Sequence, residues 1–136
     1  MSHDADLELQ KAIHARLCAD APLAALVATR VYDNAPGEAA FPYVTLGENE
    51  TSDQGGDDIR VSEHRLTIYV WSRRGGRSEA KTIMAALGDA LHDAALELTG
   101  HSLVNLRFVS ADTRRASDNA TWLGVVRFRA VTQAIE

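Results

Sequence analysis

The residue types most often used for metal binding and acid–base catalysis are poorly spaced for either task in this chain. Its five histidines are His3, His14, His64, His92 and His101. None belongs to an HxH, HxxxH or HExxH arrangement, so no local pair presents two imidazoles on one face of a strand or helix. His92 and Asp93 are interpreted as part of a solvated helix face. His64, which precedes Arg65 in a predicted strand, is expected at a rim or interface.

Acidic residues gather in one polar stretch, at Glu48, Glu50, Asp53, Asp57 and Asp58. A calcium loop needs ligands at fixed alternate positions and a closing bidentate Glu, and this stretch lacks that pattern. Few apolar side chains lie between the acids, so burial cannot order the segment strongly. The stretch therefore predicts a mobile acidic loop at about residues 48–58, whose tip projects from the body.

Other catalytic patterns are missing from the sequence as well. The glycine pairs at 55–56 and 75–76 fit neither GxxxxGK[ST] nor GxGxxG, and no GxSxG is present. Cys18 is the single cysteine, so it can form neither an internal disulfide nor a CxxC site. Its position beside Leu17 on an apolar helical stretch predicts a buried thiol. We predict that the chain is not an enzyme and holds no cofactor or metal.

Arginines lie where they could meet a partner, and the predicted interface residues are Arg73, Arg74, Arg77, Arg127 and Arg129. The first three share a predicted turn, and the last two share one face of the final predicted strand. Arginine suits interfaces because its planar fork makes several hydrogen bonds at once. Surface solubility is the alternative for the turn arginines. Basic turns and an acidic loop on one chain favour head-to-tail assembly, which closes into a ring when the rotation allows it.

The bulk composition fits one domain covering residues 1–136, with 46% hydrophobic and 24% charged residues. No apolar run approaches the length of a membrane span, and the acidic, polar N-terminus does not resemble a signal peptide. We therefore expect synthesis in the cytoplasm and no membrane partner. The formal net charge of −5 argues against a broad basic face that binds nucleic acid, but allows DNA to pass nearby.

Hydrophobic periodicity predicts two main helices. Leu9, Ile13 and Leu17 recur along one face of a helix from about residue 6 to 19. Asp20, followed by Ala-Pro, predicts a helix restart, because Asp caps free N–H groups and Pro is tolerated in a first turn. A second long helix begins at Ser78 and buries a stripe of apolar residues, namely Ile83, Leu87, Ala90, Leu91 and Ala94.

Strands are predicted in hairpin pairs. Short extended pieces at 30–32 and 41–47 precede a strand at 59–71, in which a bulge near 62–64 reconciles two opposite parities. The last third is a hairpin with strands at about 103–114 and 122–131, and its buried face carries Val126, Phe128 and Ala130. The fold class is therefore α+β, with an antiparallel β-sheet of about four to five strands packed against two main helices.

Several segments resemble a family of small phage and prophage proteins associated with tail completion. The matching segments are LELQKAIHARLCAD, PLAALVATRVYDNAP, FPYVTLGE, HRLTIYVWSRRGGRSEAKTIMAALGDAL and TWLGVVRFRAVTQ. Together they cover nearly the whole chain, but most of the matching positions are of core type. They therefore support the fold better than the role, and the acidic loop has no match.

The resemblance implies a tail terminator of a long-tailed phage or of a phage-derived particle such as a gene transfer agent. Such proteins form a hexameric ring that caps the tail tube, ends its polymerisation and docks to the head connector. The implied partners are other copies of the chain, the tail tube protein and a head–tail connector or stopper, with DNA only as passing cargo. Arg73, Arg74 and Arg77 would lie at subunit or ring contacts. The acidic loop would reach a neighbouring ring or line the channel.

Three other roles fit the sequence. A head–tail stopper or a minor tail component would be built from a similar sheet, because folds of this size serve several roles. A small ligand-binding module would instead show a pocket with a few converging polar groups.

Overall fold

The helices and strands that the sequence predicts occur in the expected order, with one additional short strand. The computed structural model describes residues 4–56 and 58–135. In this part of the chain the elements are α1 (Ala5–Ala19), α2 (Ala21–Val27), β1 (Val31–Tyr32), β2 (Tyr43–Asp53), β3 (Val61–Ser72), α3 (Ser78–Leu91), β4 (Glu97–Leu98), β5 (His101–Arg115) and β6 (Trp122–Ala134).

Both N-terminal helices begin at an aspartate that caps free backbone N–H groups. The Asp4 carboxylate accepts a hydrogen bond from the Asp6 N–H at 3.4 Å, and the Asp20 carboxylate accepts one from the Leu23 N–H at 3.1 Å. Pro22 lies in the first turn of α2, where a backbone N–H would make no hydrogen bond within the helix, so the absence of an N–H in proline costs nothing. The predicted helix restart at Asp20 is confirmed.

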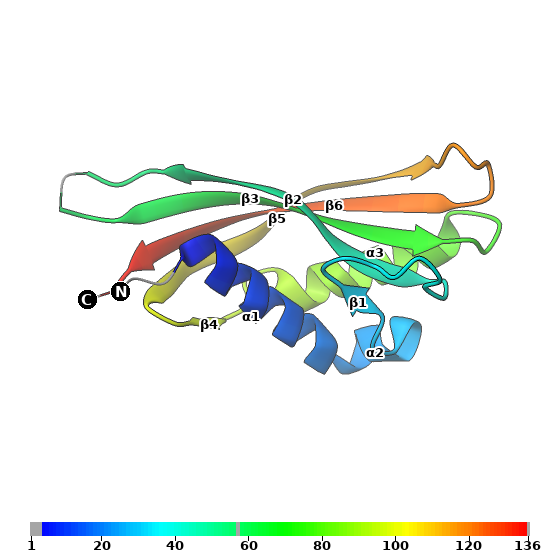
Figure 1. Cartoon of the computed structure of the whole chain (residues 1–136), viewed down its shortest axis with the longest axis horizontal. Helices are drawn as coiled ribbons and strands as arrows, with labels where there is room; N and C mark the ends of the chain where they lie inside the picture. The colour runs from blue at the N-terminus through cyan, green and yellow to red at the C-terminus, as the bar shows by residue number, and fades with distance from the viewer. Residues whose placement is uncertain (1–3, 57, 136) are drawn as a thin grey trace.

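One mixed sheet holds the strands in the order β1-β2-β3-β6-β5-β4. β1 runs parallel to β2, and the other neighbouring strands are antiparallel. The helices cover one face of the sheet and leave the other open (Figure 1). The predicted α+β class is confirmed. The sheet has six strands rather than four to five. The extended piece predicted at 30–32 forms β1 at one edge, and β4, a two-residue strand that was not predicted, lies at the other.

Two hairpins extend in opposite directions beyond the helices (Figure 1). The β2–β3 hairpin has its strand ends at Asp53 and Val61, and the β5–β6 hairpin turns at residues 116–121. β3 and β6 pair along their lengths without a register shift, so the expected bulge near 62–64 is wrong. Ile59, whose parity suggested that bulge, precedes the strand. The shift lies in β2 instead, between Leu46 and Asn49.

The predicted acidic loop at 48–58 is too long. Residues 48–53 continue strand β2, and residues 49–53 pair with β3. This pairing satisfies backbone hydrogen bonds whether the side chains are polar or apolar. The acidic residues that therefore belong to a strand are Glu48, Glu50 and Asp53. Asp58 lies in the turn that follows, and Asp57 lies outside the described residues.

The core lies between the helices and the covered face of the sheet. Predicted core residues that are buried there include Leu9, Ile13, Leu17, Ile83, Leu87, Leu91, Val126, Phe128 and Ala130. Burying each large aliphatic side chain contributes about 1.5–3 kcal/mol. Cys18 is exposed, contrary to expectation, because α1 turns the neighbouring Leu17 inward. None of the described helices is long and apolar enough to cross a bilayer.

Candidate functional site

The turn between β3 and α3 carries three of the predicted interface residues, Arg73, Arg74 and Arg77. Gly75 and Gly76 have φ values of 73° and 154°, a region that glycine adopts without the strain of a side chain. The turn lies at the same end of the sheet as the β5–β6 turn (Figure 1).

Arg73 joins these two turns. Its Nε donates a hydrogen bond to Thr121 Oγ1 at 2.9 Å, and its Nη2 donates to Asp118 Oδ2 at 3.2 Å. The guanidinium also lies 4.3 Å from the centroid of the Phe41 ring, within the range of a cation–π contact. Arg73 is therefore held in place by partners distant in sequence.

Asp118 organises the β5–β6 turn. Its carboxylate accepts hydrogen bonds from the Ala120 and Thr121 N–H groups at 2.9 Å each, and from the Thr121 hydroxyl at 2.7 Å. These bonds, and that from Arg73, favour the charged form and hold the pKa of Asp118 well below its usual range. The turn thus presents a fixed negative charge to Arg73.

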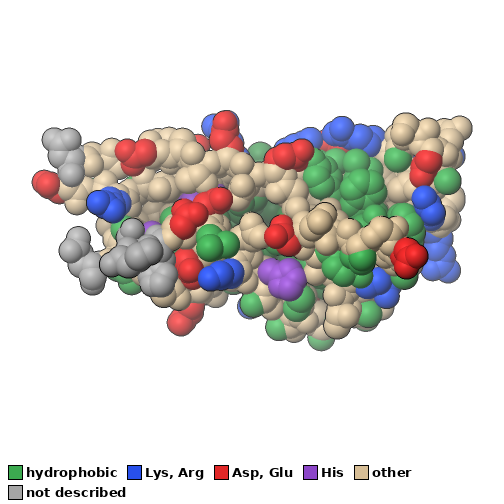
Figure 2. Space-filling view, in the orientation of Figure 1, with side chains coloured by type: hydrophobic (Ala, Val, Ile, Leu, Met, Phe, Trp, Pro, Cys, Tyr) green, Lys and Arg blue, Asp and Glu red, His purple; other side chains and the backbone are tan. Residues whose placement is uncertain are grey.

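Two further arginines lie against Trp122 at this end of the sheet. The guanidinium carbons of Arg77 and Arg115 lie 4.4 and 5.1 Å from centroids of the Trp122 rings. Arg74 is 79% exposed and lies 3.5 Å from Glu79. Figure 2 shows Lys and Arg side chains gathered at this end of the molecule. We call the group the arginine end; its members are Arg73, Arg74, Arg77, Arg114 and Arg115.

Arg127 and Arg129 lie elsewhere, on the open face of the sheet. Arg127 donates to Asp112 at 2.8 Å, and Arg129 donates to Glu63 at 2.5 Å. These hydrogen bonds are the largest causes that lower the pKa values of Asp112 and Glu63. Both strand arginines therefore lie in cross-strand ion pairs. Arg127 shares Asp112 with Arg114 of the arginine end, whereas Arg129 has no such link to it among the contacts of the described residues.

Glu50, Asp53 and Asp58 lie on the β2–β3 hairpin, at the opposite end from the arginine end, whereas Glu48 lies nearer the middle of the sheet. Glu48 accepts a hydrogen bond from the Tyr69 hydroxyl, which lowers the Glu48 pKa. Glu50 is 77% exposed and lies 4.0 Å from Arg65. Asp53 accepts from the Gly55 N–H at 3.1 Å. Asp and Glu side chains predominate over this half of the molecule (Figure 2).

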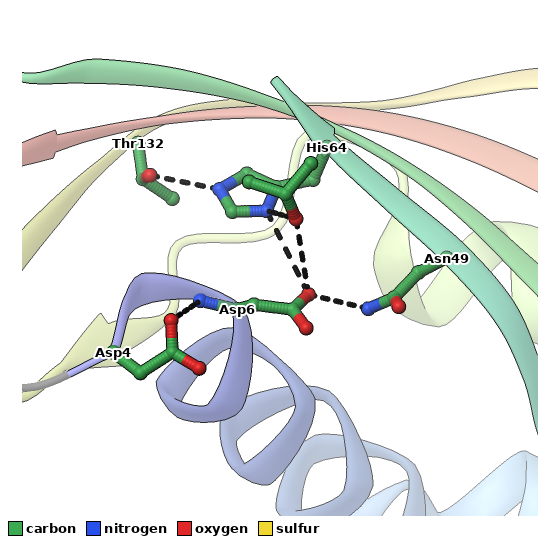
Figure 3. A network of polar contacts seen from close by, with 6 residues as sticks. Asp4, Asp6, Asn49, His64 and Thr132 are labelled. Atoms are coloured by element: carbon green, nitrogen blue, oxygen red, sulfur yellow. Dashed lines mark hydrogen bonds and ion pairs between the residues drawn. The ribbon is translucent and has the colours of Figure 1, made fainter. Parts of the chain in front are cut away.

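A buried polar network at the base of this hairpin was missed by the sequence reasoning. His64 is fully buried, contrary to the expected rim position. Its Nδ1 lies 3.0 Å from Thr51 Oγ1, and its Nε2 lies 2.9 Å from Thr132 Oγ1. Asp6, at the start of α1, lies 3.9 Å from Nδ1 and accepts a hydrogen bond from Asn49 (Figure 3). The network ties α1 to β2, β3 and β6.

An Asp–His–Thr series could in principle activate a hydroxyl nucleophile. Here the Thr132 side chain is only 1% exposed, so a substrate cannot reach it. Burial lowers the pKa of His64, while Asp6 and Asp4 act to raise it. We interpret the network as a structural tie between elements. Among the described residues no group of three or more His, Cys, Asp or Glu could hold a metal ion.

An aromatic groove on the open face was also missed. The Tyr43 and Trp71 rings stack with centroids 5.9 Å apart, and Tyr69 lies 6.1 Å from Trp71. These rings and residues 33–35 line a groove of about 370 Å³. The alternation of residues 66–71 could have indicated that the aromatic parity faces away from the core.

Comparison with solved structures defines the class of protein to which this fold belongs. The chain is similar to a chain in the virion of a native gene transfer agent particle, with 36% identity and a TM-score of 0.92. That match covers 98% of this chain and 100% of the other. The fold and the match define a structural protein of phage-type particles.

The particular family follows from the sequence. The family model described as tail completion protein gp17 matches residues 11–133, and the chain therefore belongs to this family of tail structural proteins. The predicted resemblance is confirmed. The fold is shared with the gp17 protein of bacteriophage SPP1, at 24% identity and a TM-score of 0.66, over 97% of this chain and 91% of that one. No curated protein matches the chain.

Proposed function

We propose that this chain is a tail terminator: copies of it form a ring that caps the tail tube, ends tube polymerisation and docks the tail to the head connector. The observation that carries the proposal is the end-to-end similarity to a chain of a gene transfer agent virion, together with membership of a tail completion family. A six-membered ring is the expected closure. Its partners are the tail tube protein and a connector or stopper protein.

The charged surfaces support this assembly. The arginine end and the acidic β2–β3 hairpin lie at opposite ends of one sheet, so opposite charges of successive copies or rings can meet. Arg73, Arg74 and Arg77 form one side of such contacts. The acidic set, Glu48, Glu50, Asp53, Asp57 and Asp58, reaches a neighbouring ring or lines the channel, where negative charge repels DNA phosphates and lets the cargo slide.

Arg127 and Arg129 belong to a third surface in this proposal. They lie on the open sheet face, where ion pairs with Asp112 and Glu63 orient their guanidinium groups. A face of oriented, alternating charges suits contact with a polar partner surface better than contact with an apolar one. We assign this face to contacts between rings.

The experiment that tests the ring is native mass spectrometry of the purified chain, alone and with short tube fragments that template it. The proposal predicts an assembly of six copies of the 14.8 kDa subunit. Arg74→Glu should weaken the assembly, because the Arg74 side chain is 79% exposed and its ion pair is with nearby Glu79, so most of the guanidinium is free to meet another copy. Lys11→Glu is the matched control, since Lys11 is a 63% exposed cation on α1.

A chain that stays monomeric both alone and on tube fragments would refute the ring. Equal assembly of Arg74→Glu and Lys11→Glu would remove the arginine turn from the contact and leave the ring itself in place.

A further inference from the structure

The sheet has two edges that the chain covers only in part. On one side, β1 pairs with β2 at Val44 and Thr45 alone. β2 continues to Asp53, and in the described chain no strand lies against the outer side of residues 46–53. Such an edge presents a row of backbone N–H and C=O groups that can pair with another chain.

The opposite edge is β5. β4 pairs with it only at His101 and Ser102. Further along, the His92–Asp93 segment covers the edge: the Asp93 N–H donates to the Leu106 carbonyl at 2.8 Å, and the Phe108 N–H donates to His92 Nδ1 at 3.0 Å. The covering ends there.

Residues 109–115 therefore form the open part of the β5 edge within the described structure. Val109, at a register shift, is 56% exposed, which is unusual for a large apolar side chain on a strand. From Ser110 to Arg115 the strand pairs regularly with β6, so its backbone is in position to extend the sheet by one more strand.

The two open edges carry opposite charge. Residues 46–53 contain three acids and no Lys or Arg, and residues 109–115 contain two arginines and one acid. On the first edge Glu50 is 77% exposed, and on the second Arg114 is 56% exposed. Joining two β2 edges would bring like charges together, whereas joining β2 to β5 brings opposite charges together.

We infer that the β2 edge of one copy pairs with the β5 edge of the next, so that the sheet runs continuously across the subunit boundary. This inference rests on the ring proposed above and names the surface that closes it. The contact is heterologous, because each copy offers a different edge on each side, and such contacts generate rings when the rotation closes. The helices then lie on one side of this continuous sheet, and the charged open face lies on the other.

Cysteine crosslinking tests this contact directly. Cys18 is first replaced by Ser, because it is exposed and would react. Ser52→Cys and Ser110→Cys are then introduced together, one on each open edge and nearly isosteric with the native residues. A short bismaleimide, which tolerates a small offset in register, is added to the assembled chain, and products are separated under denaturing conditions.

The inference predicts a ladder of covalent multimers for the double variant, and little product for either single variant. The matched control combines Ser52→Cys with Ser102→Cys. Ser102 lies on β5, as Ser110 does, but at a position where β4 covers the edge, so this control variant should give no ladder. Native mass spectrometry of each variant shows whether the ring itself is present.

Three results would overturn the edge pairing. If the double variant forms a ring but gives no ladder, or a ladder no stronger than that of the control variant, the edge contact is refuted and the ring is retained. Strong dimers from Ser110→Cys alone show that two β5 edges meet instead. The third result is that neither the double variant nor its Cys18→Ser parent assembles, although circular dichroism shows that the parent is folded. That result contradicts both the ring and the edge pairing.

Discussion

His64 shows how a single buried residue can hold several elements together. It sits on the covered face of β3 between Thr51 of β2 and Thr132 of β6, and it lies near Asp6 of α1. A buried imidazole is tolerated because both ring nitrogens have partners. A charged imidazole at the same place would lose its favourable hydration energy, and electrostatic attraction to Asp6 and Asp4 compensates for that loss only in part.

The stability of the fold should therefore fall in mildly acidic solution. The folded-state pKa of His64 lies below its ordinary value of 6.5, chiefly because of burial, with His101 adding to the effect. The unfolded chain then binds the proton more readily, so the free energy of unfolding decreases as the pH falls below about 6.5. Urea unfolding from about pH 8 to about pH 5 measures this slope.

His64→Gln is the control for that slope, since glutamine keeps polar atoms at the site but does not titrate. The variant should be less stable than the native chain at neutral pH, and its stability should change less as the pH falls. An equal or steeper slope in the variant would show that other groups cause the pH dependence.

The sequence predicted an arginine-rich turn after β3, but it did not predict which residues those arginines contact within the chain. The arginine turn was predicted from Arg73, Arg74 and Arg77, and the structure places these side chains together. Arg73, however, meets Thr121 and Asp118, which no spacing rule links to it. The burial of His64 was missed for the same reason: its partners lie on strands that meet only in the folded sheet.

At the scale of elements, α3 can lie close to the sheet because β6 has a glycine beneath it. A Cβ at Gly124 would lie 2.6 Å from Met84 Sδ and 3.3 Å from Val70 Cβ. Methionine is flexible and can yield to a single methyl group, but a branched side chain would also press against Val70.

Substitution at Gly124 should therefore be destabilising in proportion to size. Gly124→Ala is expected to lower the free energy of unfolding by about 1 kcal/mol, and Gly124→Val by up to about 3 kcal/mol, through overpacking. Gly88→Ala in α3 is the matched control: its Cβ would meet nothing within 4 Å, and alanine should stabilise the helix by about 0.5–1 kcal/mol. Urea unfolding checks all three, and a Gly124→Val chain as stable as the native one would contradict the close packing.

Local patterning predicted the helices and the last hairpin because apolar residues recur in these segments with the period of the helix or strand that they form. It missed the continuation of β2 through residues 48–53, whose polar side chains carry no such signal; these residues are strand because β3 pairs with them. It also missed the position of the bulge. Whether a polar segment is a loop or an arm of a sheet depends on its partner strand, which local composition does not specify.

At the scale of the whole molecule, one elongated sheet separates an arginine end from an acidic hairpin (Figures 1 and 2). Helices on a single face leave the other face open, and parts of both sheet edges are open as well. This arrangement accords with the family to which the chain belongs, whose members complete phage tails. On this basis we propose that copies of the chain close a ring on the end of the tail tube.

Electron microscopy of particles assembled without this chain is the most direct test of that account. Particles made from the same gene cluster with the coding sequence deleted are compared with particles in which it is restored. A missing terminator should leave tubes that grow beyond their normal length and do not join heads, and restoring the chain should correct both defects. Tails of normal length attached to heads, or normal tails beside heads that have lost their DNA, would contradict the account.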